Sequence, residues 1–146
     1  MSVKDIYSLD EWAFYDLWLL YSIFSWKKGS NLAYIISAGD YYNHAIFLPE
    51  ELNFGMSKLI YNGYVESLES GRFRQTRKAK SFFRKNGKPF EGCFDTLFRL
   101  KPIFTALPIK SGCVYREYFT QDEIDSAVKK YTDEFEKALK SLKNKT

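Results

Sequence analysis

The stretch LIYNGYVESLESGRFRQTRKAK, residues 59–80, carries the clearest structural signals of this 146-residue chain. Gly63 follows an apolar helical pattern and precedes alternating residues, as glycine does where a helix stops before a strand. Two short alternating runs then flank a turn that contains Gly71, which predicts a β-hairpin. Thr76 follows at once and predicts the N-cap of a further helix over Arg77–Lys85.

The apolar pattern predicts three helices before this hairpin, over Ser8–Lys28, Asn31–Gly39 and Pro49–Gly63. The first opens on Ser8 and Glu11, spaced as a capping box, and is apolar nearly all round. Such a helix is buried on more than one face. The segment Gly39–Phe47 is predicted to be irregular and longer than a tight turn between helices.

The C-terminal part is predicted to be helical as well. A short helix is expected around Phe94–Leu100, ending before Pro102, and the last helix opens on the capping box Thr120–Glu123. Its apolar residues recur at steps of four and three, which is a heptad-like seam: Ile124, Val128, Tyr131, Phe135, Ala138 and Leu142. We expect either a homodimer, through the Trp12–Trp26 helix and the Ile124–Leu142 helix, or packing within one chain.

The net charge of +4 hides an uneven distribution. Residues 1–71 hold 4 basic and 9 acidic side chains, and residues 89–146 hold 10 basic and 9 acidic ones. Residues 72–88 hold 8 basic and no acidic side chains: Arg72, Arg74, Arg77, Lys78, Lys80, Arg84, Lys85 and Lys88. A cluster of this kind indicates contact with nucleic-acid phosphates or, alternatively, a solvated helix face.

Composition and motifs argue against several classes of protein. No apolar stretch reaches the roughly 20 residues that span a bilayer, and the N-terminus lacks the layout of a secretion signal, so we expect a cytoplasmic protein without membrane contact. The single histidine, His44, and the isolated thiols Cys93 and Cys113 offer no metal-binding spacing. No nucleotide-binding or hydrolase motif occurs. We therefore expect no enzyme, no cofactor and no metal.

The phrases Leu59-x-x-x-Gly63-Tyr64-Val65 and Phe73-x-x-Thr76-x-x-Ala79-Lys80, after three helices, resemble the winged helix-turn-helix of small bacterial regulators such as the MarR and PadR groups. The resemblance covers residues 9–86 and implies a mainly α fold with a small β-hairpin. It divides the chain into a winged-helix domain, residues 1–88, and a C-terminal helical extension, residues 89–146.

The resemblance also implies a DNA-binding transcriptional regulator. The wing and the following helix would hold phosphates of double-stranded DNA, and the third helix would enter the major groove. The residues expected to contact phosphates are Arg72, Arg74, Arg77, Lys78 and Lys80. Those expected to contact bases are Asn53, Ser57 and Lys58.

A second function stays open beside the first. Glu50 and Glu51 at the start of the third helix would face phosphates unfavourably, which favours a winged-helix module that binds another protein. Its expected partner surface is Tyr41, Tyr42 and Phe54. A third alternative is a ligand-sensing regulator that holds a small apolar molecule between the first helix and the C-terminal region.

Overall fold

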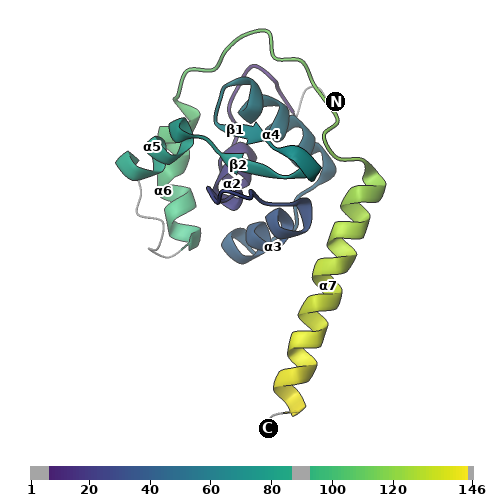
Figure 1. Ribbon diagram of the computed structural model, residues 1–146. Coiled ribbons are helices and arrows are strands. Elements are labelled where there is room, and N and C mark those ends of the chain that lie inside the picture. Colours follow the sequence, from purple (N-terminus) through teal and green to yellow (C-terminus); the bar gives the residue numbers. More distant parts are fainter. Residues whose placement is uncertain (1–6, 87–92, 145–146) are drawn as a thin grey trace.

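The computed structural model describes residues 7–86 and 93–144, with side chains from residue 95 onward in the second range (Figure 1). These residues form six α-helices, one short 3-10 helix and a two-stranded antiparallel sheet, so the expectation of a mainly helical fold with a small hairpin is confirmed. The elements are α2 (Phe14–Ser22), α3 (Leu32–Asn43), α4 (Pro49–Tyr61), β1 (Val65–Ser67), η1 (Glu69–Gly71), β2 (Phe73–Gln75), α5 (Arg77–Asn86), α6 (Cys93–Thr105) and α7 (Gln121–Asn144).

Helix α2 is shorter at both ends than the sequence predicts. It begins at Phe14, because the Asp16 carboxylate accepts a hydrogen bond from the Ala13 amide at 2.8 Å and so closes the first turn. Ser8 instead accepts a hydrogen bond from the Asp10 amide at 3.0 Å and belongs to a separate turn. At the other end Ile23 is already extended, so residues 23–28 lie outside the helix.

Residues 24–30 leave α2 because they pair with the hairpin. The Ser30 amide donates to Phe73 O at 2.7 Å, the Phe73 amide donates back to Ser30 O at 2.9 Å, and the Gln75 amide donates to Phe24 O at 3.2 Å. Gly29 makes the close approach possible, because a Cβ there would stand 2.8 Å from Phe73 O and the residue has φ of +71°. This pairing is long-range and overrides the local helical pattern.

Helix α3 runs past Gly39, which the sequence marked as a helix end. The glycine serves packing: a Cβ at this position would lie 2.3 Å from the ring of Phe47. Its carbonyl also accepts the indole N–H of Trp18 at 2.9 Å. The helix ends at His44, which adopts the left-handed conformation. Residues 44–48 therefore form a short turn, and the expectation of a long irregular segment is wrong.

The hairpin and the helix that follows it agree with the sequence. Val65 pairs with Gln75 and Ser67 with Phe73 in antiparallel register. The turn uses positive φ at Gly71 and at its neighbour Ser70. The Thr76 hydroxyl accepts the Ala79 amide at 3.4 Å at the start of α5, as the cap prediction requires.

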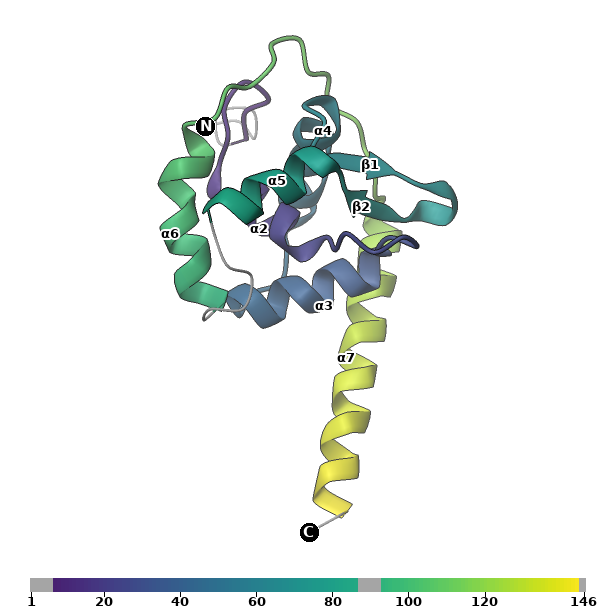
Figure 2. The same cartoon turned by 60° about the vertical axis from the view of Figure 1, so that its left-hand side comes forward.

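Helix α6 continues through Pro102 to Thr105, which corrects the expectation that it ends before the proline. Proline removes one hydrogen bond in the last turns of the helix. Residues 106–120, which we call the α6–α7 linker, then arch over α4 and lead into α7 (Figures 1 and 2).

The hydrophobic core surrounds α2, in which every residue from Tyr15 to Ser22 is buried. Helices α3, α4 and α6 pack on it from different sides (Figure 2). The apolar circumference predicted for the first helix is thus covered largely within the chain, which leaves α2 little apolar surface for a second copy. The homodimer expected through this helix stays a prediction. Within the described residues no helix has the length and apolar character needed to cross a membrane.

The domain boundary expected at residues 88 and 89, and Lys88 itself, lie outside the described residues. On the C-terminal side of that boundary, α6 and the start of α7 contribute to the same core as α2. Leu97, Leu100 and Phe104 of α6 are fully buried there, and Ile124 of α7 is nearly so. The packing therefore joins the two parts.

Candidate nucleic-acid interface

The third helix buries the polar residues that were expected to reach DNA bases. Lys58 and Asp16 form an ion pair, with Nζ and Oδ2 2.6 Å apart, and both side chains are 0% exposed. The Lys58 ammonium also donates to Glu11 O and to the Tyr15 hydroxyl, each at 3.0 Å, so all three of its N–H donors are used. Lys58 is therefore a core residue, and its expected base contact is wrong.

Burial governs the chemistry of the Asp16 carboxyl. Removal from water raises its pKa to about 6, although the ammonium of Lys58 and the Ala13 amide favour the charged form. Oδ1 of Asp16 is buried without a hydrogen-bond partner among the described residues. Burying this ion pair therefore costs desolvation free energy, and removing either partner would leave the other one buried without compensation.

Asn53 and Ser57 are buried because the α6–α7 linker lies against them. The Asn53 side chain donates to Phe119 O at 3.0 Å and accepts the Phe119 amide at 2.9 Å. Ser57 Oγ accepts the Arg116 amide at 3.0 Å, and its single hydrogen lies between Asn53 O at 2.8 Å and Arg116 O at 3.1 Å. Both side chains therefore bind the backbone of the linker.

The same linker is held at the C-terminal end of α4. The Lys110 amide donates to Asn62 Oδ1 at 2.7 Å, and the Tyr61 hydroxyl donates to Ser111 O at 2.8 Å. Cys113 contacts the same face through its thiol, which lies 3.5 Å from Ser57 O. Helix α4 is thus enclosed by the core on one side and by the linker on the other, and the expected base contacts of Asn53 and Ser57 are wrong as well.

Arg72 and Arg74, the two arginines of the hairpin that were expected to contact phosphates, both bind this chain. Arg74 forms an ion pair with Glu66 of the neighbouring strand and donates to Lys27 O at 2.9 Å. Arg72 donates to Gly29 O at 3.4 Å. These contacts hold residues 27–29 beside β2 and leave the two guanidinium groups only partly exposed.

Helix α5 presents most of the predicted cations to solvent. Its buried side consists of Ala79, Phe82 and Phe83. Lys78 donates to Asn62 O at 2.8 Å, and its ammonium lies over the Tyr64 ring. Its charge is therefore partly engaged in contacts within the chain. The remaining four cations are exposed around the side of the helix that faces away from its buried residues, and we call them the basic face: Arg77, Lys80, Arg84 and Lys85. None of them has a carboxylate of residues 7–86 or 93–144 within ion-pair distance.

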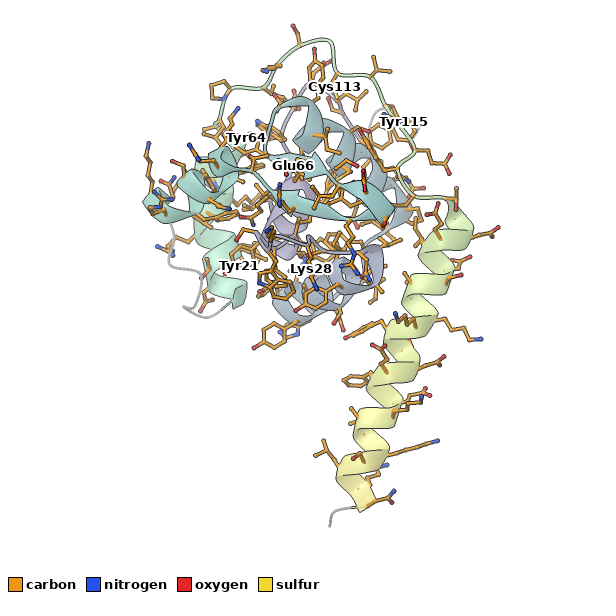
Figure 3. The ribbon with its side chains drawn as sticks, in the orientation of Figure 1. Tyr21, Lys28, Tyr64, Glu66, Cys113 and Tyr115 are labelled. Atoms are coloured by element: carbon orange, nitrogen blue, oxygen red, sulfur yellow. The ribbon has the colours of Figure 1, made fainter. Side chains whose placement is uncertain are left out.

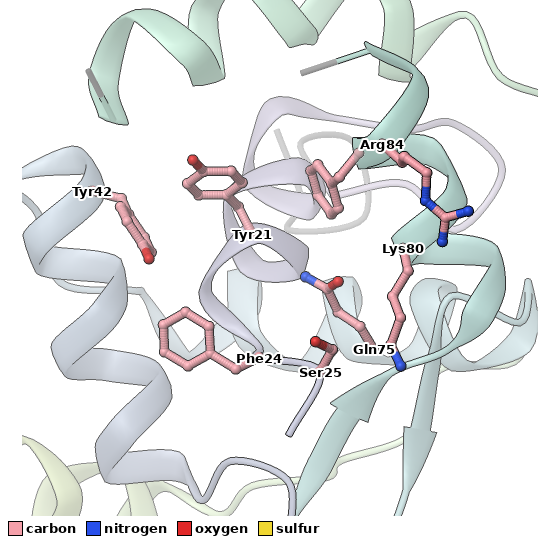
Figure 4. Close-up of a pocket in the computed structure, with 8 residues that line it drawn as sticks. Tyr21, Phe24, Ser25, Tyr42, Gln75, Lys80 and Arg84 are labelled. Carbon is pink, nitrogen blue, oxygen red and sulfur yellow. The ribbon is translucent and has the colours of Figure 1, made fainter. Parts of the chain in front are cut away.

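A cavity of about 430 Å³ opens beside the basic face (Figure 4). One side carries aromatic rings from α2, α3 and the segment after α2, and the opposite side carries the side chains of Lys80 and Arg84 from α5. The lining residues are Tyr21, Phe24, Ser25, Tyr42, Gln75, Lys80, Phe83 and Arg84. Sequence reasoning did not find this site, because its walls come from four separate segments; the high aromatic content was the only hint.

A second hollow of about 320 Å³ adjoins the cavity and shares Phe24 and Tyr42 with it. Tyr34 and Tyr41 complete its aromatic lining. The predicted partner surface is therefore divided. Tyr41 and Tyr42 line this hollow, whereas Phe54 packs between Tyr7 and Tyr115, with ring centroids at 5.5 and 4.7 Å.

Helix α7 separates into a docked and a projecting half (Figures 1 and 3). Ile124 and Ala127 are buried, and the Tyr131 hydroxyl donates to Asp40 of α3 at 2.5 Å. Beyond this contact the seam is bare, with Phe135 54% and Leu142 63% exposed. The first half of this helix therefore packs within the chain, and the apolar edge of the second half stays exposed among the described residues.

Comparison of the chain with family models, curated proteins and solved structures finds no match.

Proposed function

We propose that this chain is a winged-helix protein that binds nucleic acid by its phosphate backbone, with the basic face of α5 as the main contact. The order of α2, α3, α4, hairpin and α5 supports the winged-helix part. The pairing of residues 24–30 with β2 also supports it, because it adds an isolated antiparallel bridge between Ser30 and Phe73 at the edge of the hairpin. A regulatory role on double-stranded DNA, which the sequence resemblance implies, belongs to this proposal.

The observation that carries the proposal is the exposure of four cations on the solvent side of α5 without a carboxylate partner among the described residues. Phosphates that bind such cations release condensed counterions, so the affinity falls steeply with salt concentration. Because α4 is enclosed by the linker, this contact holds the backbone and does not depend on a helix in the major groove. Sequence selectivity from direct base contacts of α4 is therefore not expected in this conformation.

Fluorescence anisotropy of a labelled random duplex, measured over a range of salt concentrations, tests the proposal. Replacing both Arg77 and Lys85 by Gln removes two exposed cations that do not line the cavity beside the basic face, so it should reduce the slope of log K against log salt by about 2. The matched control replaces Lys129 and Lys137 of α7 by Gln, with the same change in net charge. Equal effects of the two pairs, or no duplex binding at low salt, would reject the basic face as a phosphate site.

A second candidate function is protein interaction, which the projecting half of α7 favours. Its seam continues the heptad spacing past the last contact with α3, so the bare edge has the geometry of one strand of a coiled coil. We propose a second copy of this chain as the occupant, since identical seams pair naturally about a two-fold axis. Light scattering should give a dimer mass for the wild type and a monomer mass for Phe135→Glu/Leu142→Glu; a monomeric wild type at high concentration refutes this pairing.

A further inference from the structure

The cavity and the adjoining hollow form one continuous surface, which we call the aromatic groove. They share two rings, Phe24 and Tyr42, and each is lined by further aromatic side chains. Figure 4 shows Tyr21, Phe24 and Tyr42 gathered on the side away from α5. The members of the groove come from α2, α3, the segment after α2 and α5: Tyr21, Phe24, Tyr34, Tyr41, Tyr42 and Phe83.

The outer part of this groove exposes an unusual amount of aromatic surface. Tyr41 is 71% exposed, and Trp26 beside the groove is 52% exposed. Trp26 stacks on Phe24 with ring centroids 4.8 Å apart and meets Tyr34 at 5.1 Å. Water-facing rings at this density are costly for a free protein surface and are typical of a site that receives another flat, apolar group.

Cations stand along the same groove. Lys80 and Arg84 form its wall on α5, opposite the tyrosines, and both belong to the basic face (Figure 4). Lys27 and Lys28 are exposed next to Trp26 in the chain. The groove thus combines flat rings with positive charge, which is the combination that binds the bases and phosphates of a single strand.

We propose that the aromatic groove holds unpaired bases of single-stranded nucleic acid, with the neighbouring phosphates on Lys80 and Arg84. The phosphate part of this inference rests on the function proposed above, and the base part is independent of it. Duplex DNA offers no free base faces, since its bases stack on each other, whereas an unpaired base presents both faces to a ring. DNA and RNA strands share this chemistry.

The decisive comparison uses fluorescence anisotropy with four labelled probes of one length, about twenty nucleotides, so that each covers the groove and the basic face. They are a mixed-sequence DNA strand, the RNA strand of the same sequence, the DNA duplex, and a DNA strand without bases. The DNA strand should bind at least about tenfold more tightly than the strand without bases, because stacking adds to phosphate contact. The RNA arm shows which sugar the groove prefers.

Two variants locate the effect. Tyr41→Ser removes a ring that is largely exposed, so the fold should be retained, and it should bring the affinity for the DNA strand towards that of the strand without bases. Phe98→Ser removes a ring of α6 that is 52% exposed and does not line the groove, so it should change neither affinity. In the wild type, the strand with bases should also quench the fluorescence of Trp26, and Trp26→Phe identifies that signal.

The possible failures are distinct. Equal affinity for strands with and without bases would overturn the groove as a base site and leave the phosphate contact standing. A duplex that binds as tightly as the single strand would overturn the preference for unpaired bases. Absence of binding to every probe at low salt would overturn both this inference and the proposed function.

Discussion

Replacing Lys58 by Met tests the buried ion pair between Lys58 and Asp16. The side-chain volume is nearly retained, but Asp16 loses an ammonium 2.6 Å away and is left as a buried charge. Breaking a buried pair by removing one partner costs about 3–5 kcal/mol of unfolding free energy. The Tyr15 hydroxyl and Glu11 O also lose their shared donor, which places the expectation at the upper end of that range.

The pH dependence gives this variant a signature of its own. In the wild type, burial holds the pKa of Asp16 at about 6, above its ordinary 3.8. The native state therefore favours the protonated acid, and the contribution of Asp16 to stability falls as pH rises between these two values and is constant above them. Without Lys58 the pKa of Asp16 rises further, so the variant should lose more stability at pH 8 than at pH 5.

Urea denaturation followed by circular dichroism at both pH values measures the effect, with Lys129→Met as the exposed control. Asp16→Asn in the Lys58→Met background removes the orphaned charge and should recover at least about 1 kcal/mol, a coupling that is usual for residues in direct contact. A loss below about 1 kcal/mol for Lys58→Met at pH 8 would refute the buried pair, because such a value is typical of exposed ion pairs.

Three further changes test the packing around this centre. Asn53→Ala leaves the Phe119 amide and carbonyl without their partner, so it should lower the unfolding free energy by about 2–4 kcal/mol; hydrogen exchange at Phe119 should accelerate, and unchanged exchange would mean that other contacts hold the linker. Gly39→Ala places a Cβ 2.3 Å from the Phe47 ring and should cost about 1–3 kcal/mol by thermal denaturation; Phe47→Leu in the same chain should restore part of the loss, and a wild-type melting temperature for Gly39→Ala would contradict this contact. Tyr131→Phe removes the hydrogen bond to Asp40, which raises the pKa of Tyr131 to about 12 from 10.0; the bond therefore stabilises α7 below pH 10 and is lost as pH approaches 12. Hydrogen exchange at Ile124–Tyr131 should be faster in this variant, and equal exchange at neutral pH would show that the bond does not hold α7.

The elements that could be predicted from the sequence are those whose signals lie within a few residues of each other. Gly63 and Gly71 supply the positive φ values that end a helix and turn a hairpin, and both do so in the structure. Thr76 caps α5 through the Ala79 amide, and Thr120 forms a reciprocal capping box with Glu123. These interactions span three residues, so the local pattern contains both partners. The cations of the basic face were likewise visible as a run of charge.

Tertiary contacts decided the rest, because the partners are far apart in the chain. Asn53 and Phe119 are separated by 66 positions. The spacing of polar residues along α4 is the same whether they face solvent or the α6–α7 linker, so the sequence does not distinguish the two cases. Similarly, the helical pattern continues to Lys28, but residues 24–30 form backbone hydrogen bonds with β2 instead of helical ones. The aromatic groove could not be found in the sequence for the same reason: its rings and cations are distant in the chain and become neighbours only when α2, α3 and α5 pack together.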